Sequence, residues 1–163
     1  MNYWINIHWP TLARDKLKLP SPLPDNGYHY QVYLPDGRQD AGQELRASDY
    51  VFIYETKGGR PRKDGKKYAL GKQGIIALVR ALEPILDTHA EPEEYADGGS
   101  IRWNWQARTQ VVELHFCSHD DVCKILGYST AWTLRGFGDQ KSGLKKLTQK
   151  QFESLFGCFR ASD

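Results

Sequence analysis

The chain begins with MNYWINIHWP, a segment rich in aromatic and amide side chains and almost free of charge. Apolar and other side chains alternate through residues 2–9, so a strand there would carry Trp4, Asn6 and His8 on one face. Rings stack on the faces of a nucleobase, and amide or imidazole groups read its Watson–Crick edge. The opening segment therefore has the residue types of a pocket that receives an extruded base.

Other aromatic side chains and one carboxylate extend this constellation. Glu55 ends the apolar segment YVFIYE and would accept a hydrogen bond from the amino group of a cytosine. Core burial is the alternative role of every ring, because large rings dominate the burial of a small domain. The aromatic set consists of Trp4, Trp9, Tyr28, Tyr30, Trp103 and Trp105.

Cations cluster in two glycine-containing stretches, which predicts contacts with phosphates. A cation near a phosphate releases a condensed counterion, although a basic loop that is merely solvated is the alternative. In the first stretch Asp64 is the acid that opposes them, and its cations are Lys57, Arg60, Arg62, Lys63, Lys66, Lys67 and Lys72. The second stretch, LRGFGDQKSGLKKL, contains Arg135, Lys141, Lys145 and Lys146.

One alternative is a metal-dependent nuclease. Pro35-Asp36, followed by Glu55-Thr56-Lys57, fits the loose PD…(D/E)xK pattern, in which two carboxylates hold Mg²⁺ and the lysine assists a water. The spacing of this pattern is permissive, and Asp36 lies in PDG, which favours a type I turn rather than a strand.

A zinc site is the other metal hypothesis. Its ligands would be His115, Cys117, His119 and Cys123, but no CxxC is present and these residues span a strand end and a helix start. We therefore expect neither a metal nor a cofactor.

The elements that must position these side chains are mostly short strands. We expect a bulge after Val111, where the apolar phase shifts. Ser118 should cap a helix that ends at Gly127, and Thr148 a last helix closed by Gly157. Residues 56–73 and the acidic segment 83–99 should be irregular and exposed. The expected strands cover 2–9, 28–34, 50–55, 74–82, 101–116 and 129–135, with a short helical turn at 11–17.

Bulk properties are those of one globular domain. The chain has 163 residues, a net charge of +2, 40% hydrophobic and 26% charged residues, which predicts a single domain over residues 1–163. No apolar run approaches the roughly 18 residues of a membrane span, and no secretory signal is recognisable. Three cysteines cannot all pair, which favours reduced thiols in a cytoplasm.

The order of these segments resembles the EVE domain of the PUA-like superfamily, to which YTH and ASCH domains also belong. The segments that carry the resemblance are YWINI, GYHYQV, ASDYVFIYET, IIALVRAL, IRWNWQARTQV and LTQKQFESL. The opening NYWINIHWP is most similar to the amino-terminal reader of bacterial EVE–HNH restriction enzymes. The resemblance implies an α+β fold with a small, strongly bent mixed β-barrel flanked by short helices, which agrees with the element order.

The resemblance also implies a function. Such modules bind a flipped modified base, and in bacteria they serve modification-dependent restriction with a fused nuclease. We therefore expect a non-enzymatic, cytoplasmic prokaryotic reader of double-stranded DNA carrying 5-methyl- or 5-hydroxymethylcytosine, with a fused or associated HNH nuclease domain as a partner and no membrane. Another PUA-like module, for RNA or a different modified base, is the alternative.

The implied pocket can be placed on this sequence. The YTH cage takes aromatic residues from a loop where this chain offers only Tyr95, and this favours modified cytosine over N6-methyladenine. The expected pocket residues are Asn6, His8, Trp9, Tyr28, Tyr30, Tyr54, Glu55 and Trp105. The expected contacts with the phosphate backbone are Lys57, Arg60, Arg62, Lys63, Lys66, Lys67, Arg135, Lys141 and Lys145.

Overall fold

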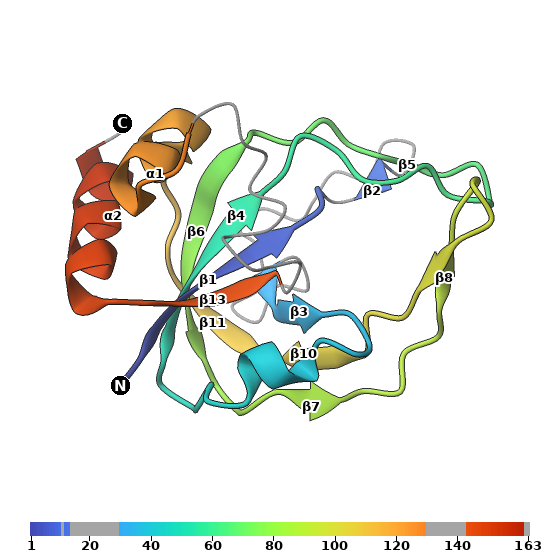
Figure 1. The fold of residues 1–163 in the computed structure, drawn as a ribbon, viewed down its shortest axis with the longest axis horizontal. Coiled ribbons are helices and arrows are strands. Elements are labelled where there is room, and N and C mark those ends of the chain that lie inside the picture. The colour runs from blue at the N-terminus through green and yellow to red at the C-terminus, as the bar shows by residue number, and fades with distance from the viewer. Residues whose placement is uncertain (11, 14–29, 130–142, 162–163) are drawn as a thin grey trace.

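A computed structural model describes residues 1–10, 12–13, 30–129 and 143–161, in which strands form a strongly bent arrangement with two helices at one end (Figure 1). The α+β class and the flanking helices are as expected from the sequence. The elements are β1 (Tyr3–His8), β2 (Leu12–Ala13), β3 (Val32–Leu34), a 3₁₀ turn (Gln39–Gly42), β4 (Tyr50–Glu55), β5 (Lys67–Tyr68), β6 (Gly74–Ala81), β7 (Leu86–Asp87), β8 (Glu93–Glu94), β9 (Ser100–Ile101), β10 (Trp105–Ala107), β11 (Thr109–Glu113), β12 (Cys117–Ser118), α1 (His119–Leu126), β13 (Leu144–Leu147) and α2 (Gln149–Ala161).

The largest sheet has the strand order β11-β6-β4-β1-β13, with β12 also paired to β6. Strands β1 and β4 are parallel, and the other pairings of this sheet are antiparallel. A second sheet has the order β3-β10-β7. Parallel pairing brings the carboxyl ends of β1 and β4 to the same edge, where His8 lies opposite Glu55.

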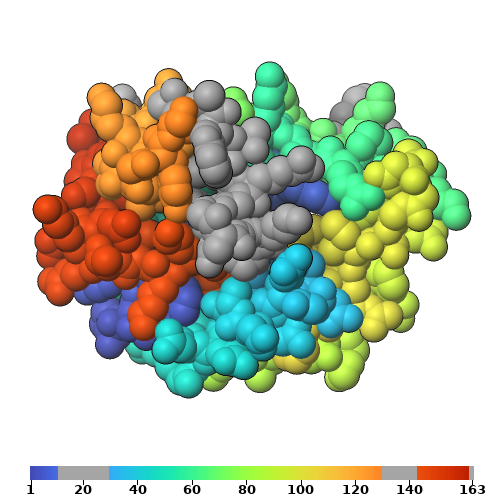
Figure 2. Space-filling view, in the orientation of Figure 1, coloured from blue at the N-terminus to red at the C-terminus, as the bar shows by residue number. Residues whose placement is uncertain are grey.

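The large sheet is buried on both faces, and each face has its own core. The outer face packs against α1 and α2, through Ile5, Phe52, Tyr54, Ile75, Leu78, Val122, Leu155 and Phe159. The inner face packs toward β3 and β10, through Trp4, Val32, Leu34, Val51, Ile53, Ala77, Val79 and Ala107. Figure 2 shows the two helices (orange and red) gathered at one end of the molecule. Neither α1 nor α2, the helices of the described part, has the length and apolar character needed to cross a membrane.

The two faces of β1 are used differently from the interpretation of the sequence. The sequence predicts a base pocket on the face of β1 that carries Trp4, Asn6 and His8. Instead, Ile5 packs toward the helices, while Asn6 is fully buried on the inner side of the sheet with Trp4. The helices require a continuous apolar face, and the isoleucines provide it.

The long strand expected over 101–116 is divided among three short strands, β9, β10 and β11, which lie in different sheets. The bulge is confirmed, because the pairing of β11 with β6 shifts register between Val111 and Glu113. The acidic segment is not wholly irregular or exposed, since it contains β7 and β8 and buries Tyr95 to 1% exposure.

Strand β13 and residues 12–13 also differ from what the sequence predicted. Strand β13 was missed because its sequence, LKKL, carries two lysines, of which Lys146 faces solvent. Residues 12–13 form a strand rather than the expected helical turn. The remainder of that turn and the strand expected over 129–135 lie outside the described residues, apart from Ser129.

Both helices begin at the predicted caps. The Ser118 hydroxyl accepts a hydrogen bond from Asp121 N at 3.2 Å, and α1 ends at Gly127, whose φ is 80°. Thr148 Oγ1 accepts from Gln151 N at 3.1 Å, while Gln151 Oε1 accepts from Thr148 N at 2.9 Å, a reciprocal capping box. The expected end at Gly157 is wrong, because α2 continues to Ala161 and buries Phe159.

A buried carboxylate fixes the start of β1. Asp49 is 2% exposed and accepts hydrogen bonds from Asn2 N at 2.9 Å, from Trp4 Nε1 at 3.0 Å and from Arg46 N at 3.0 Å. These bonds join the turn before β4 to the amino end of β1, so they help to hold the parallel pair in register.

Replacing Asp49 with alanine should lower the free energy of unfolding by about 3 kcal/mol. Three donors lose their charged acceptor and are left at a site that is shielded from water. Urea unfolding followed by tryptophan fluorescence measures the change. Asp40→Ala, at an exposed aspartate, is the control and should change the free energy by less than about 0.5 kcal/mol. Equal effects of the two substitutions would contradict the anchoring role.

Candidate functional site

Three polar side chains meet where β1 and β4 end. His8 and Glu55 are register partners, and Thr56 N donates to His8 O at 2.9 Å. Lys72 N donates to Glu55 Oε1 at 2.9 Å, which orients the carboxylate. Burial, as the larger cause, and the negative charge of Glu55 raise the pKa of Tyr30 above its ordinary value. We call His8, Tyr30 and Glu55 the edge site.

Asn6 lies behind the edge site rather than in it. Its side-chain nitrogen donates to Tyr33 O at 3.1 Å and to Gly143 O at 2.7 Å. Its side-chain oxygen accepts from Tyr33 N at 3.1 Å and is 2.6 Å from His8 Nε2. All four hydrogen-bonding positions of the amide are thus occupied within the protein. The amide cannot also read a base edge, which corrects the role expected from the sequence.

Tyr54 lies on the opposite face of the sheet from the edge site. Successive side chains of a strand alternate between faces, so Tyr54 points away from the face of Ile53 and Glu55. Its hydroxyl is hydrogen-bonded to His119 Nδ1 at 2.8 Å beneath α1, and burial, followed by the charges of Cys123 and Asp120, raises its pKa. Tyr54 belongs to the core and not to the expected pocket.

Trp9 forms the centre of a separate aromatic cluster. Its ring makes edge-to-face contacts with Tyr68, Tyr95 and Trp103, with centroid distances of 5.2–5.6 Å. Such contacts contribute roughly 0.5–1.5 kcal/mol each beyond the burial of area. Trp9 therefore ties the loop segments around β5 and β8 to the end of β1, instead of standing open at a pocket rim.

Glu93 holds the hydroxyl side of the same cluster. Its Oε2 accepts from Tyr68 at 3.0 Å and from Tyr95 at 3.2 Å, and it pairs with the Arg62 guanidinium at 3.1 Å. Trp103 Nε1 donates to the Tyr95 hydroxyl at 3.0 Å. Sequence reasoning missed this role, because nothing local in EPEEYADGG distinguishes a carboxylate that binds tyrosines from a solvated one.

The two remaining expected pocket residues are not placed at the edge site. Trp105 lies on β10, where its Nε1 donates to Asp36 Oδ1 at 3.3 Å, beyond the far end of β3 from Tyr30. Tyr28 lies outside the described residues. Of the eight residues expected to line the pocket, the structure brings together His8, Tyr30 and Glu55.

The basic loop is partly neutralised by the acidic segment. Arg60 Nη2 donates to both carboxylate oxygens of Asp97, at 2.6 and 2.7 Å, and Lys63 pairs with Glu94 at 3.6 Å. Arg62, in addition to Glu93, pairs with Asp64 at 3.2 Å. The exposed side chains that form no ion pair with a described residue are Lys57, Lys66, Lys67 and Lys72.

The second basic set is described only in part. Lys145 Nζ donates to the Tyr128 hydroxyl at 2.9 Å, and Lys146 pairs with Glu44 at 3.2 Å. Arg135 and Lys141 lie outside the described residues, so their expected phosphate contacts stay predictions.

The geometry gives the metal hypotheses no support. Asp36 is held by Trp105 at the far end of β3, whereas Glu55 lies at the edge site. Of the proposed zinc ligands, His115 pairs with Glu113 at 3.2 Å and His119 lies 3.5 Å from the Cys123 thiol. Within the described residues, no three His, Cys, Asp or Glu side chains form a group that could hold a metal ion.

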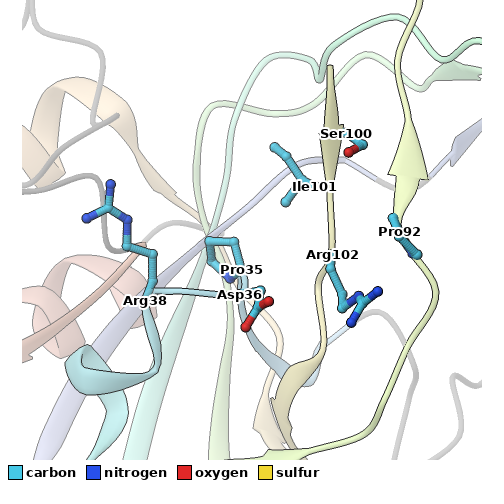
Figure 3. A pocket seen from close by; sticks show the side chains of 7 residues that line it. All are labelled: Pro35, Asp36, Arg38, Pro92, Ser100, Ile101 and Arg102. Atoms are coloured by element: carbon cyan, nitrogen blue, oxygen red, sulfur yellow. The ribbon is translucent and has the colours of Figure 1, made fainter. Parts of the chain in front are cut away.

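A surface pocket of about 460 Å³ lies between the turn after β3 and the strand β9 (Figure 3). It shares no lining residue with the edge site. Two exposed arginines and one aspartate give it its polar character, and its lining consists of Pro35, Asp36, Arg38, Pro92, Ser100, Ile101 and Arg102.

Comparison with known proteins identifies the fold. No family model and no curated protein matches the sequence. Solved structures do match: human THYN1 protein in complex with 5-methylcytosine-containing DNA has 15% identity, a TM-score of 0.53 and 96% coverage of both chains. The fold is PUA-like, of the EVE type.

Two further structures support the same fold. A hypothetical protein from Leishmania major has 10% identity and a TM-score of 0.54, covering 99% of this chain and 96% of that one. A protein from Rhodopseudomonas palustris, solved by NMR, has 7% identity and a TM-score of 0.51, covering 100% and 96%. The fold expected from the resemblance to EVE domains is confirmed.

Tyrosine ionisation should report the burial of four tyrosine side chains. Burial, as the largest cause, raises the pKa of Tyr30, Tyr54, Tyr68 and Tyr95 above the ordinary value of 10.0. The unfolded chain therefore releases these protons first, and stability that is complete below about pH 10 is lost as the pH rises further.

Tyrosinate absorbance, titrated in the native protein and in urea, measures this difference. We expect a group of tyrosines to ionise in the native protein only well above their pH of ionisation in urea. Superimposable titrations of the two states would contradict the described burial.

Proposed function

We propose that this protein is a non-enzymatic reader of modified cytosine in DNA, which receives the flipped base at the edge site. The observation that carries the proposal is the pairing of His8 with Glu55 at the joint carboxyl edge of β1 and β4, with Tyr30 under the electrostatic influence of Glu55. Glu55 would supply a hydrogen-bond acceptor and Tyr30 a donor, and the Tyr33 ring contacts His8.

The chemistry of Glu55 and Tyr30 suits the edge of cytosine. Glu55 Oε1 is held by Lys72 N, and the second oxygen has no hydrogen bond to a described residue, so it would accept from the exocyclic amino group. The Tyr30 hydroxyl is protonated at neutral pH, as an ordinary tyrosine is, and it would donate to N3 or O2 of the base. Thymine presents a carbonyl where cytosine presents the amino group, so this pair disfavours thymine.

Stacking would offset part of the cost of flipping. Unstacking a paired base costs a few kcal/mol, and each aromatic contact to the base contributes roughly 1–3 kcal/mol. The Tyr33 ring, which lies 5.4 Å from the His8 ring, and the Tyr30 ring are the aromatic groups of β3 and its approach that border the edge site.

The likeness to THYN1 supports a DNA ligand with 5-methylcytosine. That protein was solved with such DNA, and the two folds match over 96% of each chain. At 15% identity the likeness extends to the fold, so the base-reading roles rest on the residues of this chain.

We further propose that Lys57, Lys66 and Lys67 contact the phosphate backbone. They are exposed, they form no ion pair with a described residue, and Lys57 follows Glu55 by two positions. Arg60, Arg62 and Lys63 would contribute only by exchanging Asp97, Glu93 and Glu94 for phosphates.

We also propose a cellular role for this reader. The reader would act in the cytoplasm of a prokaryote, in modification-dependent restriction, where a fused or associated HNH domain would cleave the DNA. The resemblance of NYWINIHWP to the readers of EVE–HNH enzymes motivates this part.

Glu55→Gln should remove most of the preference for 5-methylcytosine over thymine, because a neutral amide accepts less strongly from the amino group and its own N–H groups oppose it. Fluorescence polarisation with duplexes that differ at one base (cytosine, 5-methylcytosine or thymine) measures the preference. A loss of at least tenfold corresponds to about 1.4 kcal/mol.

The matched control is Glu91→Gln, which makes the same change of charge at an exposed position. It should leave the preference intact. An unchanged preference in Glu55→Gln would place the discrimination elsewhere, whereas a wild-type protein without any preference, or with stronger binding to RNA, would overturn the proposed function.

The double variant Lys66→Ala with Lys67→Ala should weaken binding equally for modified and unmodified duplexes, because phosphates carry no sequence information. The slope of log affinity against log salt should fall by about 2. Lys124→Ala with Lys150→Ala, on α1 and α2, removes the same charge from the helical end and should leave the slope unchanged. Equal slopes for the two double variants would contradict the assigned interface.

A further inference from the structure

We propose that Asn6 is the positioning residue of the edge site: it locks the His8 imidazole as the Nε2–H tautomer and so determines which groups His8 can bind. The inference rests on the proposed function for its consequence in binding. The tautomer itself rests on the hydrogen bonds of Asn6 alone.

The orientation of the Asn6 amide is fixed by the backbone. Its nitrogen faces two carbonyl oxygens, Tyr33 O at 3.1 Å and Gly143 O at 2.7 Å, which can only accept. Its oxygen faces Tyr33 N at 3.1 Å, which can only donate. A flipped amide would place its oxygen against two carbonyl oxygens and its nitrogen against an N–H group, so that orientation is excluded.

The fixed amide determines the proton on His8. His8 Nε2 lies 2.6 Å from the Asn6 oxygen, which accepts, so Nε2 must carry the hydrogen. Neutral His8 therefore has its acceptor at Nδ1, and any group that hydrogen-bonds to Nδ1 must donate. The side chain is 9% exposed, and its ring meets Tyr33 edge-on at an interplanar angle of 72°, which further restricts its rotation.

Asn6 also connects segments that are distant in sequence. Its amide joins β1 to β3, 27 positions away, and to Gly143, 137 positions away. Gly143 O accepts from Ile7 N as well, at 2.8 Å, so β1 is tied to this residue through both a side chain and the backbone. Because Asn6 is fully buried, each bond that it makes would otherwise leave an unpaired polar group in the interior.

The first test is the tautomer in the wild-type protein, measured from the ¹⁵N shifts and two-bond couplings of the histidine rings. We expect His8 to populate the Nε2–H form alone at a pH where it is neutral. A Nδ1–H form, or a mixture of the two, would overturn the inference whether or not DNA binds.

The second test compares two buried asparagines. Asn6→Ala should release the ring into a mixture of tautomers and reduce the preference for 5-methylcytosine at least tenfold. Asn104→Ala removes an amide that is 3% exposed and bonded to Asp87 at 2.9 Å in the other sheet, and it should change neither readout. A pure Nε2–H signal in Asn6→Ala would overturn the positioning role.

A third pair of variants remains informative if Asn6→Ala does not fold. Glutamine carries its amide nitrogen near the position of Nε2, so His8→Gln should keep the bond to Asn6 and melt closer to the wild type than His8→Asn. The reverse order would overturn the inference. A wild-type protein with the Nε2–H tautomer but no preference among duplexes would sustain the positioning role and refute the proposed function.

Discussion

The parallel pairing of β1 and β4 is the constraint on which the rest of the structure depends. Antiparallel neighbours would place the ends of these strands at opposite edges, whereas the parallel pair brings His8 and Glu55 together. Asp49 fixes the pair at its start, and near the other end Asn6 ties β1 to β3 and to Gly143. The sheet packs against the helices on one face and against β3 and β10 on the other, so the edge site lies at the end of a sheet that is buried on both faces.

Ion pairs between the acidic segment and the basic loop neutralise part of the positive charge of that loop. The acidic segment 91–97 pairs with Arg60, Arg62 and Lys63, and the exposed cations of the loop without an ion pair to a described residue are Lys57, Lys66, Lys67 and Lys72. With a net charge of +2, nonspecific attraction to DNA should be weak. Selectivity under this account comes from the edge site, with the lysines contributing affinity that salt screens.

Local patterns predicted much of the fold, and long-range pairing accounts for what they missed. Strand β4, the start of β1, the caps at Ser118 and Thr148 and the bulge after Val111 follow from periodicity and capping chemistry. Periodicity separates the two faces of β1 but does not say which face meets the helices, so the roles of Asn6 and Tyr54 were misassigned. The edge site was predictable in His8, Tyr30 and Glu55 as residue types, while the cluster of Trp9 and Glu93 joins segments more than 80 positions apart and left no local signal.

The most direct test of the account is an amide ¹H–¹⁵N titration with two duplexes that differ at one cytosine, 5-methylated or unmodified. We predict that the methylated duplex alone shifts the amides bonded to the edge site, Thr56 and Lys72, while Val122 in α1 and Leu155 in α2 stay unchanged. Identical shifts with both duplexes, or shifts centred on the helices, would contradict the central claim that modified cytosine is read where β1 and β4 end.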